Sequence, residues 1–598
     1  HENKHLLQEI LRDEWGFDGM VVSDWGGSNS AVAAVKAGGS LEMPSPGFTS
    51  VRELEGAVKA GTLAEADINK RAAEVAKIAA ATKLVGVGRD DLLKDDIAKA
   101  HHKIARKVAE NSSVLLKNDD AVLPLKAGTR VAVIGDMAAT ARYQGSGSSK
   151  VNATKEENIL DEVKNNENLV LAGYEQGYDR QGQPDKVLLD DAVKLAKKDS
   201  VDVVVAVVGL DERSESEGLD RSTMAMPQVQ NDLVEALART GKPVVIVLVS
   251  GSPVELPWYD GVTAVLYVGL SGQAGASATV RALTGEINPS GHLAETWPLQ
   301  YEDCPSSGWY PSVERDAIYR EGPFVGYRYY ETAGVPVRFP FGYGLSYATF
   351  VYSALTATEN GVDFVITNDS DVPGATVAQL YVRGPQGGAL RPDRELKGFA
   401  KVWLNAHESK QVHIDFDRYT FRHFDTAANA WKMESGEWTL LVGDNAEHLP
   451  LAIPHMVSGD CTAADCAADP ALGHYLTGHV KDVTDAEMAV LFGHEVVASD
   501  KPTTFGVNDP ISSWVDSKGF AARTIAKTLT KREAKILAKT GCPDLNTLFV
   551  LNMPPRAMSK MTQGMVDSAM VDAIVKIANG HTFRGLGGVI AGFFRNQS

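Results

Sequence analysis

The sequence VDVVVAVVGL at residues 201–210 is almost continuously apolar and rich in valine. It is too short to span a bilayer, and β-branched residues at this density favour a strand that is buried on both faces. Three segments of the same kind lie nearby, separated by helical patterns: RVAVIGD (130–136), PVVIVLVSG (243–251) and AVLYVGL (264–270). Together they predict one doubly wound α/β sheet.

Upstream of this sheet, the chain alternates between helical and strand patterns. LLQEILRDEW (6–15) predicts an amphipathic helix, and GFDGMVVSDWGG (16–27) predicts a turn, a short buried strand and a second turn. Residues 28–37 and 51–60 have helical patterns. This rhythm is typical of α and β units around a parallel sheet.

Downstream, the texture changes near residue 349. Short alternating segments predict an antiparallel β-sandwich, among them VDFVITN (362–368) and EWTLLVG (437–443). After about residue 460 the patterns become helical, as in TDAEMAVLFG (484–493), LTKREAKILAKTG (529–541) and DSAMVDAIVKIANG (567–580).

Composition excludes several classes of function. The 598 residues carry a formal charge of -18, which disfavours binding to nucleic acid or to anionic membranes. No apolar run is long enough for a transmembrane helix. The four cysteines are too few for a disulfide framework, and the spacing in CTAADC (461–466) is not typical of a zinc site. We therefore expect no metal.

Asp24 in VVSDWGG follows a predicted strand, where carboxylates of parallel α/β folds often act in catalysis. A strand-end Asp is also a common helix cap or turn residue. The neighbouring Trp25 favours the catalytic interpretation, because an aromatic face beside a carboxylate suits a sugar ring. Trp25 is equally consistent with a core or lid aromatic.

The loop LDERSESEGLDRSTMAMP (210–227) follows the most apolar strand and is rich in acids. Such loops are usually only solvated surface. The functional alternative is that one glutamate reaches another domain as a proton donor. RYQGSGSSKVN (142–152) is rich in Gly and Ser, but it matches neither a P-loop nor a dinucleotide-binding motif.

Several of these segments resemble glycoside hydrolase family 3, in the same order along the chain. Residues 1–27 are similar to that family's nucleophile region, and residues 105–125 to its link into the second domain. SEGLDR (216–221), NPSGHLAETWP (288–298) and the sandwich follow in the family's order. LNMPPRAMSKMT (551–562) resembles an extension that some members have.

The resemblance implies an α/β multidomain fold and a role for each site residue. Asp24 matches the nucleophile and Glu217 the general acid/base, with Glu215 as the alternative acid/base and Trp25 as a substrate-binding residue. The implied domains are part of a (β/α)8 barrel (1–90), a linker (91–125), an α/β sandwich (126–300), a connecting segment (301–345), a fibronectin type III-like domain (346–455) and a helix-rich C-terminal extension (456–598).

A full barrel takes about 250 residues, whereas about 90 precede the linker here. We therefore expect an N-terminally truncated barrel that lacks most of the groups that bind the sugar. RYQGSGSSKVN is expected to lie at the rim of the active site.

The function that the resemblance implies is that of a retaining β-glucosidase that acts on terminal non-reducing β-D-glucosyl residues by double displacement, without a cofactor. A β-xylosidase or α-L-arabinofuranosidase of the same family is one alternative. An inactive fragment or split subunit that only binds carbohydrate is another. The expected partners are a β-glucoside or small oligosaccharide, and the missing barrel segment or a second copy of the chain. Neither nucleic acid nor a membrane is expected. We expect a cytoplasmic location, with secretion left open because the first residue is His.

Overall fold

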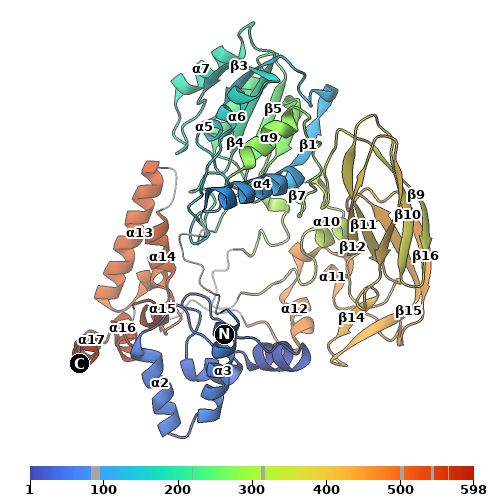
Figure 1. Cartoon of the computed structure of the whole chain (residues 1–598). Helices are drawn as coiled ribbons and strands as arrows, with labels where there is room; N and C mark the ends of the chain where they lie inside the picture. Colours follow the sequence, from blue (N-terminus) through green and yellow to red (C-terminus); the bar gives the residue numbers. More distant parts are fainter. Residues whose placement is uncertain are drawn as a thin grey trace. The chain divides into compact units, whose positions relative to one another are not determined.

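The computed structural model describes residues 1–82, 94–218, 220–310, 317–497, 504–540, 544–562 and 565–597. The chain forms two compact units (Figure 1). The first contains residues 1–94 and 499–598, and the second contains residues 95–498. None of the described helices is long and apolar enough to cross a membrane.

The N-terminal part of the first unit is mainly helical. Its elements are η1 (His5–Glu14), α1 (Ala31–Ala37), α2 (Phe48–Lys59) and α3 (Glu65–Ala81). The predicted amphipathic helix at 6–15 is present, but η1 is a π-helix. The predicted strand within 16–27 is wrong as a full strand, because Val22 forms only an isolated parallel bridge with Leu41. A longer strand needs hydrogen-bonded neighbours along its length. Residues 1–82 form no other strand with which this segment could pair.

The C-terminal part of the first unit is a helical extension. Its elements are η7 (Ile511–Asp516), α13 (Phe520–Thr540), α14 (Leu545–Asn552), α15 (Pro555–Met561), α16 (Ser568–Ala578) and α17 (Thr582–Gln597). Phe505, Trp514, Ala526 and Leu551 are buried in its own core. Residues 456–497, which were expected in the same C-terminal extension (456–598), belong to the second unit.

The second unit begins with a six-stranded sheet in the order β1-β6-β5-β4-β2-β3. The strands are β1 (Val114–Asn118), β2 (Thr129–Ile134), β3 (Leu169–Glu175), β4 (Val203–Gly209), β5 (Val244–Val249) and β6 (Ala264–Tyr267). β1 runs antiparallel to β6, and the other pairs are parallel. The four predicted strands are all present. β1, which lies inside the predicted linker, and β3 add one strand at each edge.

Helices cover both faces of this sheet (Figure 1). They are α4 (Asp95–Ser112), α5 (Asp136–Ala139), α6 (Ile159–Asn165), α7 (Lys186–Ala196), α8 (Gln228–Ala238) and α9 (Gly275–Leu283). Successive residues of β4 enter different cores, Val204 on one face and Val205 on the other. This explains why β4 has an apolar run rather than an alternating pattern.

A β-sandwich follows, as predicted. One sheet has the order β13-β10-β9 and the other β12-β11-β15-β14, with β16 paired to β15. Phe364, Leu380, Leu404 and Trp438 lie in its core. The strands are β9 (Phe350–Ala357), β10 (Gly361–Asn368), β11 (Gly374–Arg383), β12 (Glu395–Leu404), β13 (Ser409–Asp415), β14 (Arg422–Asp425), β15 (Ala430–Gly443) and β16 (Leu451–Val457).

Two short 3-10 helices lie within the α/β domain, η3 (Asp119–Ala121) and η4 (Tyr259–Gly261). Other short elements connect this domain to the sandwich or follow the sandwich. They are β7 (Trp297–Pro298), η5 (Tyr301–Asp303), α10 (Tyr327–Ala333), β8 (Val337–Phe339), β17 (Cys461–Thr462), α11 (Gly473–Thr477), η6 (Val480–Asp482) and α12 (Asp485–Phe492). Phe324, Tyr330, Tyr475 and Met488 form a core among them.

Candidate active site

Asp24 lies in an exposed loop of the first unit that the segment 41–43 holds in place. On one side of Asp24, the N–H of Ser23 donates to the carbonyl of Leu41 at 2.9 Å. On the other side, the N–H of Gly26 donates to the carbonyl of Met43 at 3.0 Å. Gly26 has a φ of 73°, a left-handed conformation that suits glycine in this turn. The backbone of the loop is therefore fixed on both sides of the carboxylate.

The side chains of Asp24 and Trp25 are both accessible. Oδ1 of Asp24 accepts a hydrogen bond of 2.6 Å from the N–H of Trp25. Trp25 is 60% exposed, so most of its indole is open to a ligand. A carboxylate beside an accessible aromatic ring can approach an anomeric carbon while the ring packs on a sugar face.

A buried charged network supports the chain just before Asp24. The N–H of Val21 donates to Oγ of Ser40 at 3.1 Å, and this hydroxyl donates to Glu74 at 2.6 Å. Arg12 forms a 3.0 Å ion pair with Glu74 and also donates to the carbonyl of Gly38 at 2.9 Å. Arg12 and Glu74 are each 9% exposed. Buried charges persist where they are paired in this way.

Glu217 lies in the second unit, in the acidic loop that follows β4. Its N–H donates to the carbonyl of Ser146 at 3.1 Å, and its exposed carboxylate accepts from the N–H of Ser148. These hydrogen bonds from Ser148 lower the pKa of Glu217. A lowered pKa favours the ionised form, so the contact with Ser148 opposes the protonated state that a general acid needs.

The Gly- and Ser-rich loop at 142–152 shapes the surroundings of Glu217. Gly147 has a φ of 105°, and a Cβ atom there would lie 2.5 Å from Oε2 of Glu217. Glycine is therefore needed for the close approach. The loop contacts a carboxylate, an arrangement unsuited to a phosphate cradle.

Glu215 has more hydrogen-bond donors than Glu217. Its carboxylate accepts from the N–H of Gly251 at 2.8 Å and from Oγ of Ser252 at 2.6 Å. Arg142 lies 3.8 Å from this carboxylate and donates to the Glu215 carbonyl at 2.9 Å. Glu215 thus ties the acidic loop to the loop after β5, which leaves Glu217 as the more accessible of the two carboxylates.

The other acids of this loop have structural partners. Asp211 is buried and accepts from the N–H of Ser214 at 2.7 Å. Glu212 pairs with Arg180 at 2.9 Å, and Asp220 accepts from Tyr310 at 2.6 Å.

Among the predicted site residues, the structure places Asp24 beside Trp25 in the first unit, and Glu215 and Glu217 on one loop of the second unit. Among the described residues, no group of three or more His, Cys, Asp or Glu could hold a metal ion.

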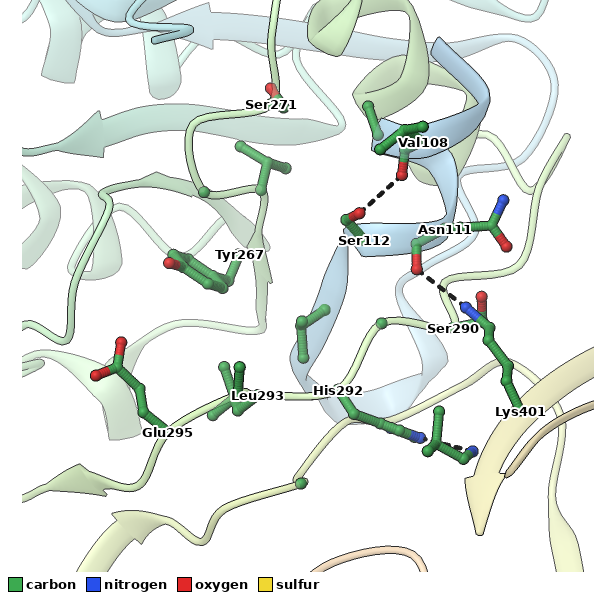
Figure 2. Close-up of a pocket in the computed structure, with 18 of the residues that line it drawn as sticks. Val108, Asn111, Ser112, Tyr267, Ser271, Ser290, His292, Leu293, Glu295 and Lys401 are labelled. Carbon is green, nitrogen blue, oxygen red and sulfur yellow. Dashed lines mark hydrogen bonds between the residues drawn. The ribbon is translucent and has the colours of Figure 1, made fainter. Parts of the chain in front are cut away.

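A pocket of about 870 Å³ in the second unit was not predicted (Figure 2). Glu295 lies at one end and Lys401 at the other, where Lys401 donates to the carbonyl of Asn111 at 3.0 Å. Burial, followed by the charge of Lys401, lowers the pKa of His292 to about 4, so His292 is neutral. Partial desolvation of its carboxyl group, followed by the charge of Glu215, raises the pKa of Glu295. The residue as a whole still has an exposed surface. The segment NPSGHLAETWP supplies much of the lining.

Comparison with known families places these loops in two matched domains. Residues 1–78, with Asp24, match the glycosyl hydrolase family 3 N-terminal domain. Residues 113–347, with Glu217, match the C-terminal domain of the same family, and residues 376–446 match a fibronectin type III-like domain.

Characterised proteins give the same result. The thermostable β-glucosidase B of Acetivibrio thermocellus is 39% identical over 527 residues, which cover 83% of this chain and 68% of that protein. The chain belongs to glycosyl hydrolase family 3. An exo-α-(1→6)-L-arabinopyranosidase of Bifidobacterium breve is also 39% identical, over 77% of this chain and 62% of that protein. The family 3 chain thus spans about two thirds of the length of these relatives.

Solved structures of family 3 members share the fold. The β-glucosidase of Bifidobacterium adolescentis is 38% identical, with a TM-score of 0.71 over 77% of this chain and 68% of that one. β-Glucosidase 3B of Thermotoga neapolitana, solved with glucose, is 29% identical, with a TM-score of 0.68 over 77% and 69% of the two chains. The predicted family and fold class are confirmed. The roles of Asp24, Trp25, Glu215 and Glu217 stay predictions.

Proposed function

We propose that this family 3 chain carries the nucleophile and the general acid/base of a retaining β-glucosidase that acts on terminal non-reducing β-D-glucosyl residues. The observation that carries the proposal is the difference between two accessible carboxylates. Asp24 lies beside an open indole, whereas Glu217 is held by a backbone N–H that can be exchanged for a substrate contact. The β-glucosidases among its relatives support the choice of sugar.

The chemistry is a double displacement. Asp24 attacks the anomeric carbon as the glycosidic bond breaks, and Glu217 donates its proton to the leaving oxygen. The product is a glycosyl ester on Asp24. Glu217, now a carboxylate, then removes a proton from a water molecule that attacks the same carbon and releases Asp24. Retention of configuration requires the two carboxyl groups to lie about 5–5.5 Å apart in the working enzyme.

A second candidate is the release of terminal α-L-arabinopyranosyl residues. It rests on the Bifidobacterium breve relative, which is as identical to this chain as the Acetivibrio β-glucosidase. The two activities differ in the sugar that they accept and share the two-carboxylate chemistry.

Hydrolysis of two aryl glycosides tests the proposal. The protein is assayed with p-nitrophenyl β-D-glucopyranoside and p-nitrophenyl α-L-arabinopyranoside, in a form extended to the full length of its relatives. We expect a higher kcat/KM for the glucoside and retention of anomeric configuration by NMR. Preference for the arabinoside would favour the second candidate, and an inverted product would overturn both.

A further inference from the structure

Helix α15 of the C-terminal extension (Figure 1) and the segment that holds the Asp24 loop both belong to the first unit and are in contact. Nζ of Lys560 lies 2.8 Å from Oε1 of Glu42 and donates to Oγ of Ser50 at 3.1 Å. Ser50 in turn donates to Oε2 of Glu42 at 2.7 Å. The three side chains form a closed triangle.

Two members of this triangle are buried, and Glu42 is partly buried. Lys560 is 4% exposed and Ser50 is 7% exposed. A buried lysine is costly, and a buried ion pair contributes little net stability compared with apolar residues of similar size. Such pairs are better explained where they fix one arrangement of two segments. The arrangement fixed here is that of α15 on residues 42–50.

Two further contacts extend from the same helix to the Asp24 loop itself. Cγ of Met561 would lie 3.5 Å from a Cβ atom on Gly26, two residues after Asp24. Arg556 donates a hydrogen bond to the side chain of Asn29. Helix α15 therefore contacts the loop as well as the segment beneath it.

The ion pair of Lys560 is linked to the residues that flank Asp24 through the backbone of residues 41–43. Glu42, its ion-pair partner, lies between Leu41 and Met43, whose carbonyls accept from Ser23 and Gly26. The hydroxyl of Ser23 also accepts from the N–H of Met43 at 2.8 Å. A shift of Glu42 would thus displace the backbone on both sides of Asp24.

We propose that Lys560 is a positioning residue for Asp24, so that the C-terminal extension is part of the catalytic apparatus. The inference rests on the proposed function for its kinetic consequence, but its structural claim stands on the Lys560–Glu42–Ser50 contacts alone. An error of about 1 Å in the position of a reacting group can lower a rate by about 100-fold.

The kinetic experiment compares Lys560→Met with the matched control Lys527→Met, whose lysine is exposed on α13 of the same extension. Both are made in the protein extended to the length of its relatives. The readout is the rate of covalent inactivation by 2-deoxy-2-fluoro-β-D-glucosyl fluoride, which traps the nucleophile. We expect Lys560→Met to slow this step by about 10- to 100-fold with little change in inhibitor binding. Lys527→Met should match the wild type, and Lys560→Arg should recover part of the rate.

A double variant separates positioning from stability. Lys560→Met alone leaves the partly buried Glu42 without its counter-ion and should lower Tm. Lys560→Met/Glu42→Gln removes both charges and should recover most of the Tm, while inactivation stays slow. Recovery of the rate together with the Tm would make the role of Lys560 merely structural and would overturn the proposal.

Hydrogen exchange gives a readout that needs no activity. The amides of Ser23 and Gly26 should exchange faster in the double variant than in the wild type, while those of β4 should not change. Unchanged exchange at Ser23 and Gly26 would overturn the positioning claim. An extended protein with wild-type residues that lacks glycosidase activity would instead overturn the proposed function, and the exchange result would still decide whether Lys560 holds the loop.

Discussion

Asp24 has an exposed carboxylate and a backbone that is hydrogen-bonded on both sides. We expect Asp24→Ala to lower β-glucosidase turnover by about 10⁴-fold or more without a loss of folding, because no other group can form the glycosyl ester. Formate or azide should restore part of the activity as a replacement nucleophile. Asp18→Ala is the control, since Asp18 is an exposed acid of the same segment. Near-normal activity of Asp24→Ala would contradict the proposed role.

Glu215 and Glu217 are distinguished by their donors. Glu217→Gln should slow substrates with poor leaving groups far more than aryl glucosides, and should flatten the basic limb of the pH profile. Glu215→Gln should lower both activities to a similar extent, because it loosens the contacts to Gly251 and Ser252. The measurement is kcat/KM on cellobiose, which has a poor leaving group, and on p-nitrophenyl glucoside. The ratio of the two values shows which glutamate is the acid/base. The opposite pattern would assign the acid/base role to Glu215.

At the scale of single residues, the sequence identified candidates but not their surroundings. The SDW and EG-x-DR motifs identified Asp24 and Glu217 through a family resemblance. Nothing in the sequence showed that Ser148 holds Glu217 or that Lys560 pairs with Glu42. Such contacts join residues that are far apart in the chain, and a buried lysine looks the same in sequence as an exposed one.

Among the elements, α4 and α9 are joined through one buried carboxylate. Glu157 accepts from Nε2 of His102 at 2.6 Å, from Lys155 at 3.0 Å and from the N–H of Ser277 at 3.1 Å. Burial alone would raise the pKa of Glu157, but hydrogen bonds from Ser277, His102 and Lys155 outweigh it and lower the pKa to about 2. The ionised carboxylate therefore stabilises the contact between these helices.

We expect Glu157→Gln to destabilise the second unit by roughly 1 to 3 kcal/mol at pH 7. Because the pKa is lowered on folding, the contribution is present above the unfolded pKa, near 4.5. It is lost as the pH falls toward 2. The difference in urea unfolding between variant and wild type should therefore shrink below pH 4.5. Glu167→Gln, at an exposed acid before β3, is the control. A difference that does not depend on pH would contradict this account.

Strands with long apolar runs were predicted from the sequence. Strands whose formation depends on pairing with a distant segment were not. Strands β2, β4, β5 and β6 are buried on both faces, so their apolar runs are distinctive. The edge strand β3 is mostly half-buried, and β1 lies directly after a long helix. The 16–27 segment was predicted as a strand from its apolar residues, but strand pairing there is limited to the Val22–Leu41 bridge.

For the whole molecule, activity should depend on the part of the relatives' length that this chain does not span. We expect the 598-residue chain alone to show no measurable β-glucosidase turnover, because the barrel groups that bind the sugar hydroxyls supply much of the catalytic rate. The α/β sheet and the sandwich have their own cores and should still fold.

Adding the remaining barrel segment of a relative, in cis or in trans, should restore turnover. The measurement is hydrolysis of p-nitrophenyl β-glucoside by the purified chain with and without that segment. Turnover by the chain alone that is lost in Asp24→Ala would contradict the prediction while supporting the role of Asp24.

The domain order was predictable from the sequence, because the spacing of apolar residues differs between domains. It is continuous in the α/β sheet, alternating in the sandwich and helical in the extension. The grouping of the chain into units was not. Residues 499–598 belong with residues 1–94, although about 400 residues separate the two segments. Local sequence patterns do not show that these two segments pack together. Their packing involves long-range contacts such as that between Lys560 and Glu42.

The Lys560–Ser50 contact also has a consequence for biosynthesis. After Ser50 is made, a ribosome must add 510 more residues to reach Lys560. At about 5 to 20 residues per second, this takes roughly half a minute to two minutes. During that time the loop around Asp24 is already made but lacks its contact with Lys560. A chain released before residue 560 would therefore carry a nucleophile that is loosely held. Such a chain would form the glycosyl ester on Asp24 slowly, even with the rest of its barrel in place.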